Sequence, residues 1–167
     1  DKLGGANLHN FDAFTPTVAN IRPTSRGEIN IVSNDSREYP KIKMNYLSTE
    51  DDRYVAALGL KIIRKIMLET KTFKKYEPEE YRPGIHIQDN EELVKAASDY
   101  AQTIFHPVGT CKMGNDNHSV VNDELKVHGI ENMRVIDASI MPNITSGNTN
   151  APTIMIAEKG ADMILEN

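Results

Sequence analysis

Residues 135–164 read VIDASIMPNITSGNTNAPTIMIAEKGADMI: an apolar run ending in an acid, a loop of small and amide residues, and a helical pattern. The apolar run begins at residue 133 and has the composition of a short strand buried in a parallel sheet. Pro152 suits the first turn of a helix, so we expect a helix over about 152–165. A strand, a loop and a helix in this order direct backbone N–H groups and a helix N-terminus at whatever occupies the loop.

A second stretch, residues 103–114, reads TIFHPVGTCKMG. Pro107 restricts His106 to extended backbone conformations, which helps to aim the imidazole. The histidine is either packed and hydrogen-bonded or directed at a ligand, and by residue type alone the packed histidine is the commoner case. Asn148, in SGNTN, is by itself a turn residue, and Gly147 before it permits an unusual backbone.

The rest of the chain predicts a mixed α+β fold. Residues 28–32 and 41–47 alternate polar and apolar, which predicts an antiparallel strand pair with one solvent-facing side. Ser48 or Thr49 precedes an acidic cluster and an apolar helical face, and this order predicts a capped helix over about 50–69. The other predicted elements are helices over 71–76 and about 90–100, and short strands at 120–121 and 125–129.

Composition and charge exclude several classes of function. The formal net charge of −5 gives no basic surface for nucleic acid. The single cysteine, Cys111, excludes an internal disulfide framework and a multi-cysteine metal site. No apolar run reaches the roughly 18 residues of a membrane-spanning helix. Because the first residue is Asp1 rather than Met, we expect further residues upstream of it.

The two quoted stretches resemble the closing signatures of the glucose–methanol–choline (GMC) oxidoreductases, the flavoenzymes that oxidise alcohols. RPTSRGEI, NYLS and YRPG resemble the same family, so the resemblance runs from about residue 20 to the end and is closest to the bacterial choline-dehydrogenase-like branch. It implies that residues 1–129 are the C-terminal part of a substrate-binding domain, with an antiparallel sheet and flanking helices. Residues 130–167 would then be the last strand, the flavin-contacting loop and the last helix of an FAD-binding domain.

One feature of that family is missing. Its members resemble one another in an N-terminal βαβ unit whose G-x-G-x-x-G turn holds the FAD diphosphate, and no such motif occurs in these 167 residues. Family members are also several times longer. We therefore expect the C-terminal portion of such an enzyme, inactive alone, with the N-terminal FAD-binding portion of the same protein as its partner. Without that portion, we expect the apolar face of the last strand to be exposed or covered by a second copy.

The resemblance implies FAD as the cofactor and an alcohol as the substrate, with a quinone- or dye-like compound as the preferred electron acceptor and oxygen as the alternative. His106 matches the family's base, a task that suits a histidine at neutral pH, and Asn148 matches the residue that holds the substrate oxygen. No metal is implied, and we expect the enzyme in the cytoplasm, free or at the inner face of a membrane. Flavin contact is implied for Asp137 and Ala138 near the ribityl chain and diphosphate, and for Asn150, Pro152 and Thr153 along the pyrimidine edge.

Other functions stay open. Plant hydroxynitrile lyases share the family's fold without redox chemistry, and a detached module could bind a partner without catalysis. Asp137 could merely cap or pair. Cys111 and His106 could form a cysteine hydrolase, but they are only five residues apart and no helix start lies nearby to activate the thiol. The scattered histidines lack the ligand spacing of a zinc site.

Overall fold

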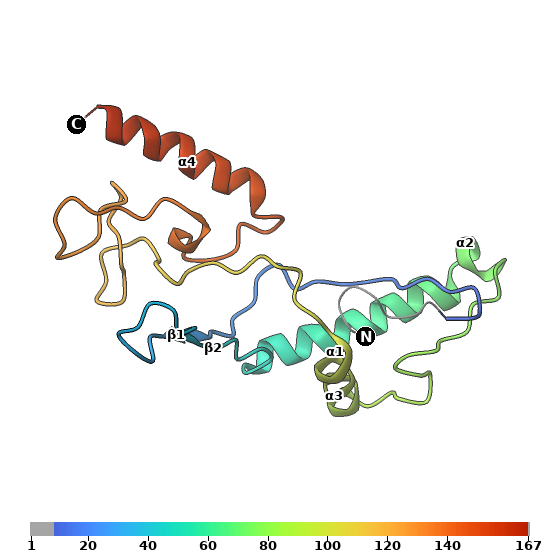
Figure 1. Ribbon diagram of the computed structural model, residues 1–167. Helices are drawn as coiled ribbons and strands as arrows, with labels where there is room; N and C mark the ends of the chain where they lie inside the picture. Colours follow the sequence, from blue (N-terminus) through green and yellow to red (C-terminus); the bar gives the residue numbers. More distant parts are fainter. Residues whose placement is uncertain (1–8, 167) are drawn as a thin grey trace.

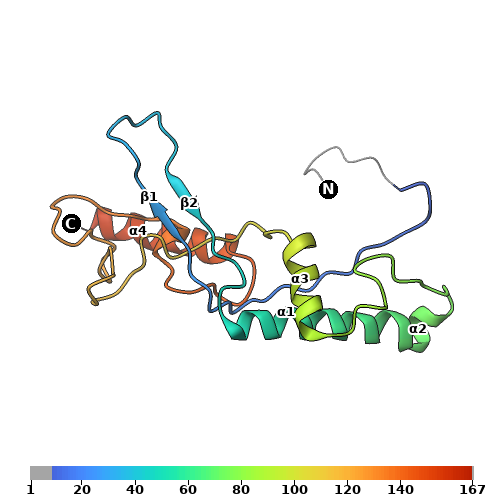
Figure 2. The same ribbon diagram turned by 90° about the horizontal axis from the view of Figure 1, so that it is seen from below.

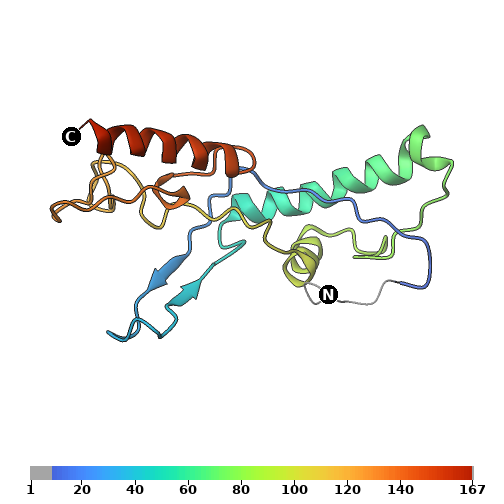
Figure 3. The same cartoon turned by 45° about the horizontal axis from the view of Figure 1, so that its top comes forward.

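The computed structural model describes residues 9–166; the first eight residues of the predicted first domain lie outside this range. In one half of the chain α3 crosses α1, and in the other α4 lies over an irregular body of loops (Figure 1). A two-stranded hairpin projects away from both halves (Figures 2 and 3). The elements are β1 (Glu28–Asn30), β2 (Lys41–Lys43), α1 (Glu50–Arg64), η1 (Lys65–Glu69), α2 (Lys71–Lys74), α3 (Asn90–Tyr100), η2 (Ala138–Ile140) and α4 (Asn150–Leu165).

Helix α1 begins where the sequence predicted it. Of the two candidate caps, Thr49 is the one whose hydroxyl accepts a hydrogen bond, from the Asp52 N–H at 3.3 Å. The predicted helix over 50–69 is confirmed in extent, but its last turn, η1, is a π-helix. The short α2 ends at Lys74, two residues before the predicted end.

The hairpin confirms the predicted antiparallel pair, with Ile29 opposite Ile42. Both strands are shorter than predicted, and β2 ends before Asn45 and Leu47, whose left-handed φ angles of 56° and 53° interrupt the extended backbone. Ile29 and Ile42 are 49% and 57% exposed, and all six strand residues are exposed. Neither side of the pair is therefore covered by the described part of the chain.

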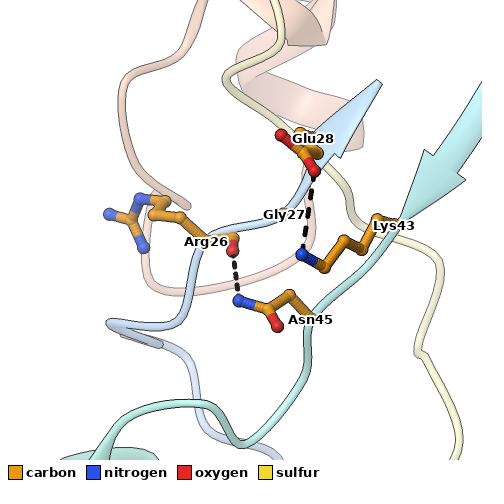
Figure 4. A pocket seen from close by; sticks show the side chains of 5 residues that line it. All are labelled: Arg26, Gly27, Glu28, Lys43 and Asn45. Carbon is orange, nitrogen blue, oxygen red and sulfur yellow. Dashed lines mark hydrogen bonds and ion pairs between the residues drawn. The ribbon is translucent and has the colours of Figure 1, made fainter. Parts of the chain in front are cut away.

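Polar contacts surround a hollow of about 200 Å³ at the base of the hairpin (Figure 4). Asn45 Nδ2 donates to the Arg26 carbonyl at 2.9 Å, and Lys43 Nζ lies 3.7 Å from the Glu28 carboxylate. Between them, a Cβ on Gly27 would collide with the Lys43 carbonyl. The two chain segments can therefore come this close only because residue 27 is glycine.

Helix α3 packs on α1 and starts at a cap formed by the Asp89 side chain. The loop before α3 is held to α1 by Arg64, whose guanidinium donates to both carboxylate oxygens of Glu80 at 2.7 and 2.9 Å. The same guanidinium donates to the carbonyls of Ile87 at 2.6 Å and Gly84 at 3.0 Å. Bidentate pairing of this kind fixes orientation as well as distance, so the loop has one position against α1.

Asp52 joins the segment before β1 to the start of α1. Its buried carboxylate accepts hydrogen bonds from the backbone N–H groups of Thr24 and Ser25, both at 2.9 Å, and from Asn20 Nδ2 at 3.1 Å. Burial alone would raise the pKa of Asp52, but hydrogen bonds from Ser25 and Thr24 outweigh burial and lower it below the ordinary value of 3.8.

A second core lies under α4, around the buried side chains Val121, Leu125, Ile140, Met141 and Ile156. At Gly160 the helix lies so close to Ile136 that an added Cβ would be 2.5 Å from Ile136 Cγ2. The strand predicted at 133–137 is wrong: in the described residues this segment forms only an isolated bridge, Lys126 with Arg134. A buried parallel strand needs strand neighbours, and the chain places helix α4 on this segment instead.

The strands predicted at 120–121 and 125–129 are also reduced to isolated bridges, between Met113 and Val121 and between Val121 and Val127. The bridge between Met113 and Val121 flanks an exposed polar loop, residues 115–118. Its base is closed by hydrogen bonds from Gly114 N to the Val121 carbonyl at 3.0 Å and from Val120 N to the Lys112 carbonyl at 2.9 Å.

No helix within residues 9–166 is both long enough and apolar enough to cross a membrane.

We expect Asp52→Asn to lower the free energy of unfolding at pH 7 by about 1.5–3 kcal/mol, because hydrogen bonds to a buried charge are lost. A carboxylate with a lowered pKa stabilises the fold fully above its unfolded value of 3.8, and this contribution disappears as pH falls through the folded pKa. The difference between wild type and variant, measured by urea unfolding, should therefore shrink below pH 3.8.

The exposed neighbour Asp51 provides the matched control. Asp51→Asn should change stability by less than about 1 kcal/mol, the scale of one charge at a helix N-terminus. If the Asp52→Asn difference stayed constant down to pH 2, the charge on Asp52 would not be what holds residues 20–25.

Candidate active site

The backbone around His106 is bent on both sides. Phe105 before it has a left-handed φ of 62°, and Gly109 after it has a φ of 88°. A Cβ on Gly109 would lie 3.3 Å from the Met141 carbonyl, so the two segments are in close contact here. Pro107 fixes the backbone between these bends.

The segment after His106 is then paired with η2. Cys111 N donates to the Ser139 carbonyl at 3.0 Å, and Met113 N donates to the Ile140 carbonyl at 2.8 Å. These two bonds bring together segments that are far apart in the sequence. They hold the histidine beside the loop that leads into α4.

Two neighbouring residues of that loop contact the imidazole. Asn148 Nδ2 lies 3.1 Å from His106 Nε2, and Thr149 Oγ1 lies 3.0 Å from His106 Nδ1. Histidine and asparagine, predicted separately from two stretches of sequence, are thus brought into direct contact. Asn148 is exposed and His106 half-buried, so the pair is open to a ligand on one side.

These contacts select a tautomer. An amide nitrogen can only donate, so Nε2 of His106 accepts the hydrogen bond from Asn148 and carries a lone pair. The hydrogen of the neutral ring is then on Nδ1, and the Thr149 hydroxyl, which can either donate or accept, takes the part of its acceptor. A lone pair on Nε2 is what a base at this position requires.

The predicted role of Gly147 as the residue with an unusual backbone is wrong. Its φ lies outside the left-handed range, and nothing lies within 4 Å of where a Cβ would be. The left-handed conformation belongs to Ser146, with a φ of 61°.

Asp137 caps the short η2 helix. Its carboxylate accepts from the N–H of Ser139 at 2.7 Å and also from the Ser139 hydroxyl. Ala138 is the first residue of the same turn. The structure shows Asp137 as a cap. Flavin contact by Asp137 or Ala138 stays a prediction.

The other three predicted cofactor residues lie in the first turn of α4, which starts at Asn150, two residues before Pro152. Thr153 donates to the Thr149 carbonyl with its N–H at 3.0 Å and its hydroxyl at 2.6 Å. No side-chain cap occupies the N-terminus of α4. Its first N–H groups are therefore available to an acceptor from outside the helix.

Thr149 is the residue of this site that sequence reasoning missed. It is 8% exposed, and it stands at the N-cap position of α4, where a threonine is an ordinary helix start. Its place directly after Asn148 was the available signal. The helix was predicted to begin at Pro152, two residues later than it does, so Thr149 was not a predicted cap.

The rival chemistries receive no support from the geometry. Both ring nitrogens of His106 are engaged by Asn148 and Thr149, so the imidazole is not paired with the Cys111 thiol. Within the described residues, no group of three or more His, Cys, Asp or Glu side chains could hold a metal ion.

Solved structures with this architecture are oxidases and related enzymes. Pyridoxine 4-oxidase from Mesorbium loti matches 88% of the chain with a TM-score of 0.81 and 32% identity, and the match covers 28% of that protein. An FAD-dependent oxidoreductase from Chaetomium thermophilum matches 87% with a TM-score of 0.82 and 28% identity, covering 25% of that protein. The chain thus has the fold of one part of these larger enzymes.

The sequence comparisons identify the family to which the chain belongs. The family model for GMC oxidoreductases matches residues 23–157, and the chain belongs to that family. It is 48% identical to the oxygen-dependent choline dehydrogenase of Proteus mirabilis and 47% identical to that of Citrobacter koseri, over 96% of the chain in each case. The chain spans 29% and 28% of the lengths of these two relatives.

We expect Gly109→Ala to cost about 1–2 kcal/mol of stability, because an L side chain is strained at a φ of 88° and the Cβ would press on the Met141 carbonyl. Gly147→Ala is the matched control and should change stability by no more than about 0.5 kcal/mol. Urea unfolding followed by circular dichroism would measure both. Equal losses would mean that the turn at Gly109 does not depend on glycine.

Proposed function

We propose that the chain is the C-terminal part of an FAD-dependent alcohol oxidoreductase, in which His106 is the base and Asn148 orients the substrate oxygen. The contact between His106 Nε2 and Asn148 Nδ2 at 3.1 Å carries this proposal. It places an acceptor and a donor side by side at an exposed edge, where an incoming alcohol hydroxyl would displace the Asn148 N–H from Nε2. An alcohol hydroxyl needs both, one for its proton and one for its oxygen.

His106 and Asn148 have complementary tasks in this proposal. The lone pair on His106 Nε2 accepts the hydroxyl proton, and Thr149 behind the ring keeps the other nitrogen protonated. The Asn148 amide donates to the substrate oxygen, a bond that strengthens as negative charge develops there. FAD, when bound, supplies the acceptor for the hydride that leaves the carbinol carbon.

The residues present fit one side of a flavin site. The uncapped N-terminus of α4 offers backbone donors to a polar ring edge, with exposed Asn150 in the first turn and Pro152 and Thr153 beside it. Asp137 and Ala138 would contact the ribityl chain from the η2 turn. The residues present do not include a binding site for the FAD diphosphate, since the sequence contains no G-x-G-x-x-G.

The large exposed area of the chain supports the proposal that a large partner covers part of it. Its accessible area is 13082 Å², whereas a compact monomer of 18.7 kDa exposes about 8,300 Å². The excess includes apolar side chains on α4, among them Leu165 at 83% exposure, and both faces of the hairpin. We propose that the N-terminal FAD-binding portion of the same protein covers these surfaces.

The alcohol to test first is choline, with oxygen as acceptor, because the Proteus mirabilis and Citrobacter koseri relatives carry the name oxygen-dependent choline dehydrogenase. A quinone- or dye-like acceptor is the second choice. The test enzyme is a fusion in which this chain replaces the matching C-terminal segment of the Proteus mirabilis relative, hereafter the fusion enzyme.

In the fusion enzyme, we expect His106→Ala to slow flavin reduction by about 10²–10⁴-fold, the usual contribution of a general base. Asn148→Ala should slow it by about 10²–10³-fold, the scale of losing one donor to a developing oxyanion. Stopped-flow reduction at saturating alcohol, in variants of matched flavin content, measures both.

Asn148→His and Asn148→Asp separate charge from shape. Histidine can still donate and should keep a partial rate, whereas aspartate is of nearly the same size but opposes the developing alkoxide. Aspartate performing as well as asparagine would mean that residue 148 only shapes the turn.

We expect the 167-residue chain alone to show no saturable quenching of FAD fluorescence in the micromolar range, because the diphosphate site is not part of it. The fusion enzyme is the positive control. A stoichiometric yellow complex of the isolated chain would contradict this expectation.

A further inference from the structure

We propose that Thr149 is a positioning residue: its hydroxyl holds the imidazole of His106 in the tautomer that leaves Nε2 ready to take a proton. The proposal rests on the proposed role of His106 as the base. Thr149 does not touch the substrate in this scheme, and it acts only through the ring.

The first argument is the pair of contacts on the ring. Asn148 donates to Nε2 at 3.1 Å, and Thr149 Oγ1 lies 3.0 Å from Nδ1 on the other side. A histidine base needs the partner of its second nitrogen to fix which nitrogen carries the hydrogen. In many enzymes a carboxylate is that partner. Here the Asn148 N–H engages Nε2, and Thr149, whose neutral hydroxyl can accept as well as donate, is the acceptor left for Nδ1–H.

The second argument is that the hydroxyl has a fixed position. Thr149 is 8% exposed, and its carbonyl accepts from both the N–H and the hydroxyl of Thr153. The helix that begins here is anchored further along by the buried Ile156 and by Gly160, which lies against Ile136. The acceptor for Nδ1 therefore belongs to the rigid end of α4 rather than to a mobile loop.

The third argument concerns the charge that forms during the reaction. When Nε2 takes the substrate proton, the ring becomes an imidazolium and the bond from Nδ1–H to the Thr149 hydroxyl becomes charge-assisted. The bond is then stronger after the proton has moved than before. An interaction of this kind favours the reaction rather than the binding of the alcohol.

Thr149→Val and Thr149→Ser test the proposal as a matched pair. Valine keeps the shape of threonine and removes the hydroxyl, whereas serine keeps the hydroxyl and removes the methyl group. In the 167-residue chain labelled with [15N]histidine, ring 15N shifts report which nitrogen of His106 carries the hydrogen, and His106→Gln identifies its signals. We expect wild type and Thr149→Ser to show the Nδ1–H form, and Thr149→Val to lose its predominance.

In the fusion enzyme, Thr149→Val should slow flavin reduction by about 10- to 100-fold, the range found when the outer hydrogen-bond partner of a metal-bound histidine is removed. The alcohol concentration for half-maximal reduction should stay within about threefold of wild type. Thr149→Ser should restore most of the rate. Flavin content and the urea unfolding midpoint are recorded for each variant.

An unchanged 15N pattern in Thr149→Val overturns the proposal, and so does a rate equally low in Thr149→Ser, which would assign the effect to packing. If the proposed function itself were wrong, the experiments would give a different set of results. In that case alcohol does not reduce the wild-type fusion enzyme, or His106→Ala does not slow it, while the 15N measurement on the chain still decides whether Thr149 sets the tautomer.

Discussion

The two backbone hydrogen bonds that pair residues 111–113 with residues 139–140 are the constraint on which the candidate site depends. Without them, His106 and Asn148 belong to separate segments with more than forty residues between them. The bonds from Cys111 to Ser139 and from Met113 to Ile140 involve only main-chain atoms, so they do not depend on the identity of those side chains. His106 and Asn148, the two residues of the proposed site, stand just outside this pairing, at its two ends.

The helix that closes the site contributes in two ways at once. Its N-cap residue Thr149 and the preceding loop residue Asn148 lie on the two sides of one imidazole, and its body covers the second core through Ile156 and Gly160. Packing energy in the body of the helix therefore fixes polar geometry at its end. A loop carrying the same two residues would have to order them at an entropic cost for each rotatable side chain.

The sequence predicted the local features of the fold and missed those that depend on neighbours. Helices α1, α3 and α4 and the hairpin were predicted because caps, periodicity and alternation are local signals. The strand expected at 133–137 requires partners that the described chain does not supply, and composition alone does not reveal their absence. At the site, motif resemblance pointed to His106 and Asn148, but Thr149 emerged only from its distance to Nδ1. The left-handed φ in this turn belongs to Ser146 and not to Gly147, the residue that could adopt it most freely.

The exposed loop of residues 115–118 has a consequence for how this chain can diversify. Hydrogen bonds at Gly114 and Val120 close the loop at its base, between its tip and the histidine segment. Lengthening a loop that is already closed costs little, about 0.6 kcal/mol for each doubling of its length. Insertions at the tip therefore leave the register of residues 106–113 unchanged. A surface appendage added here would leave the contact between His106 and Asn148 unchanged.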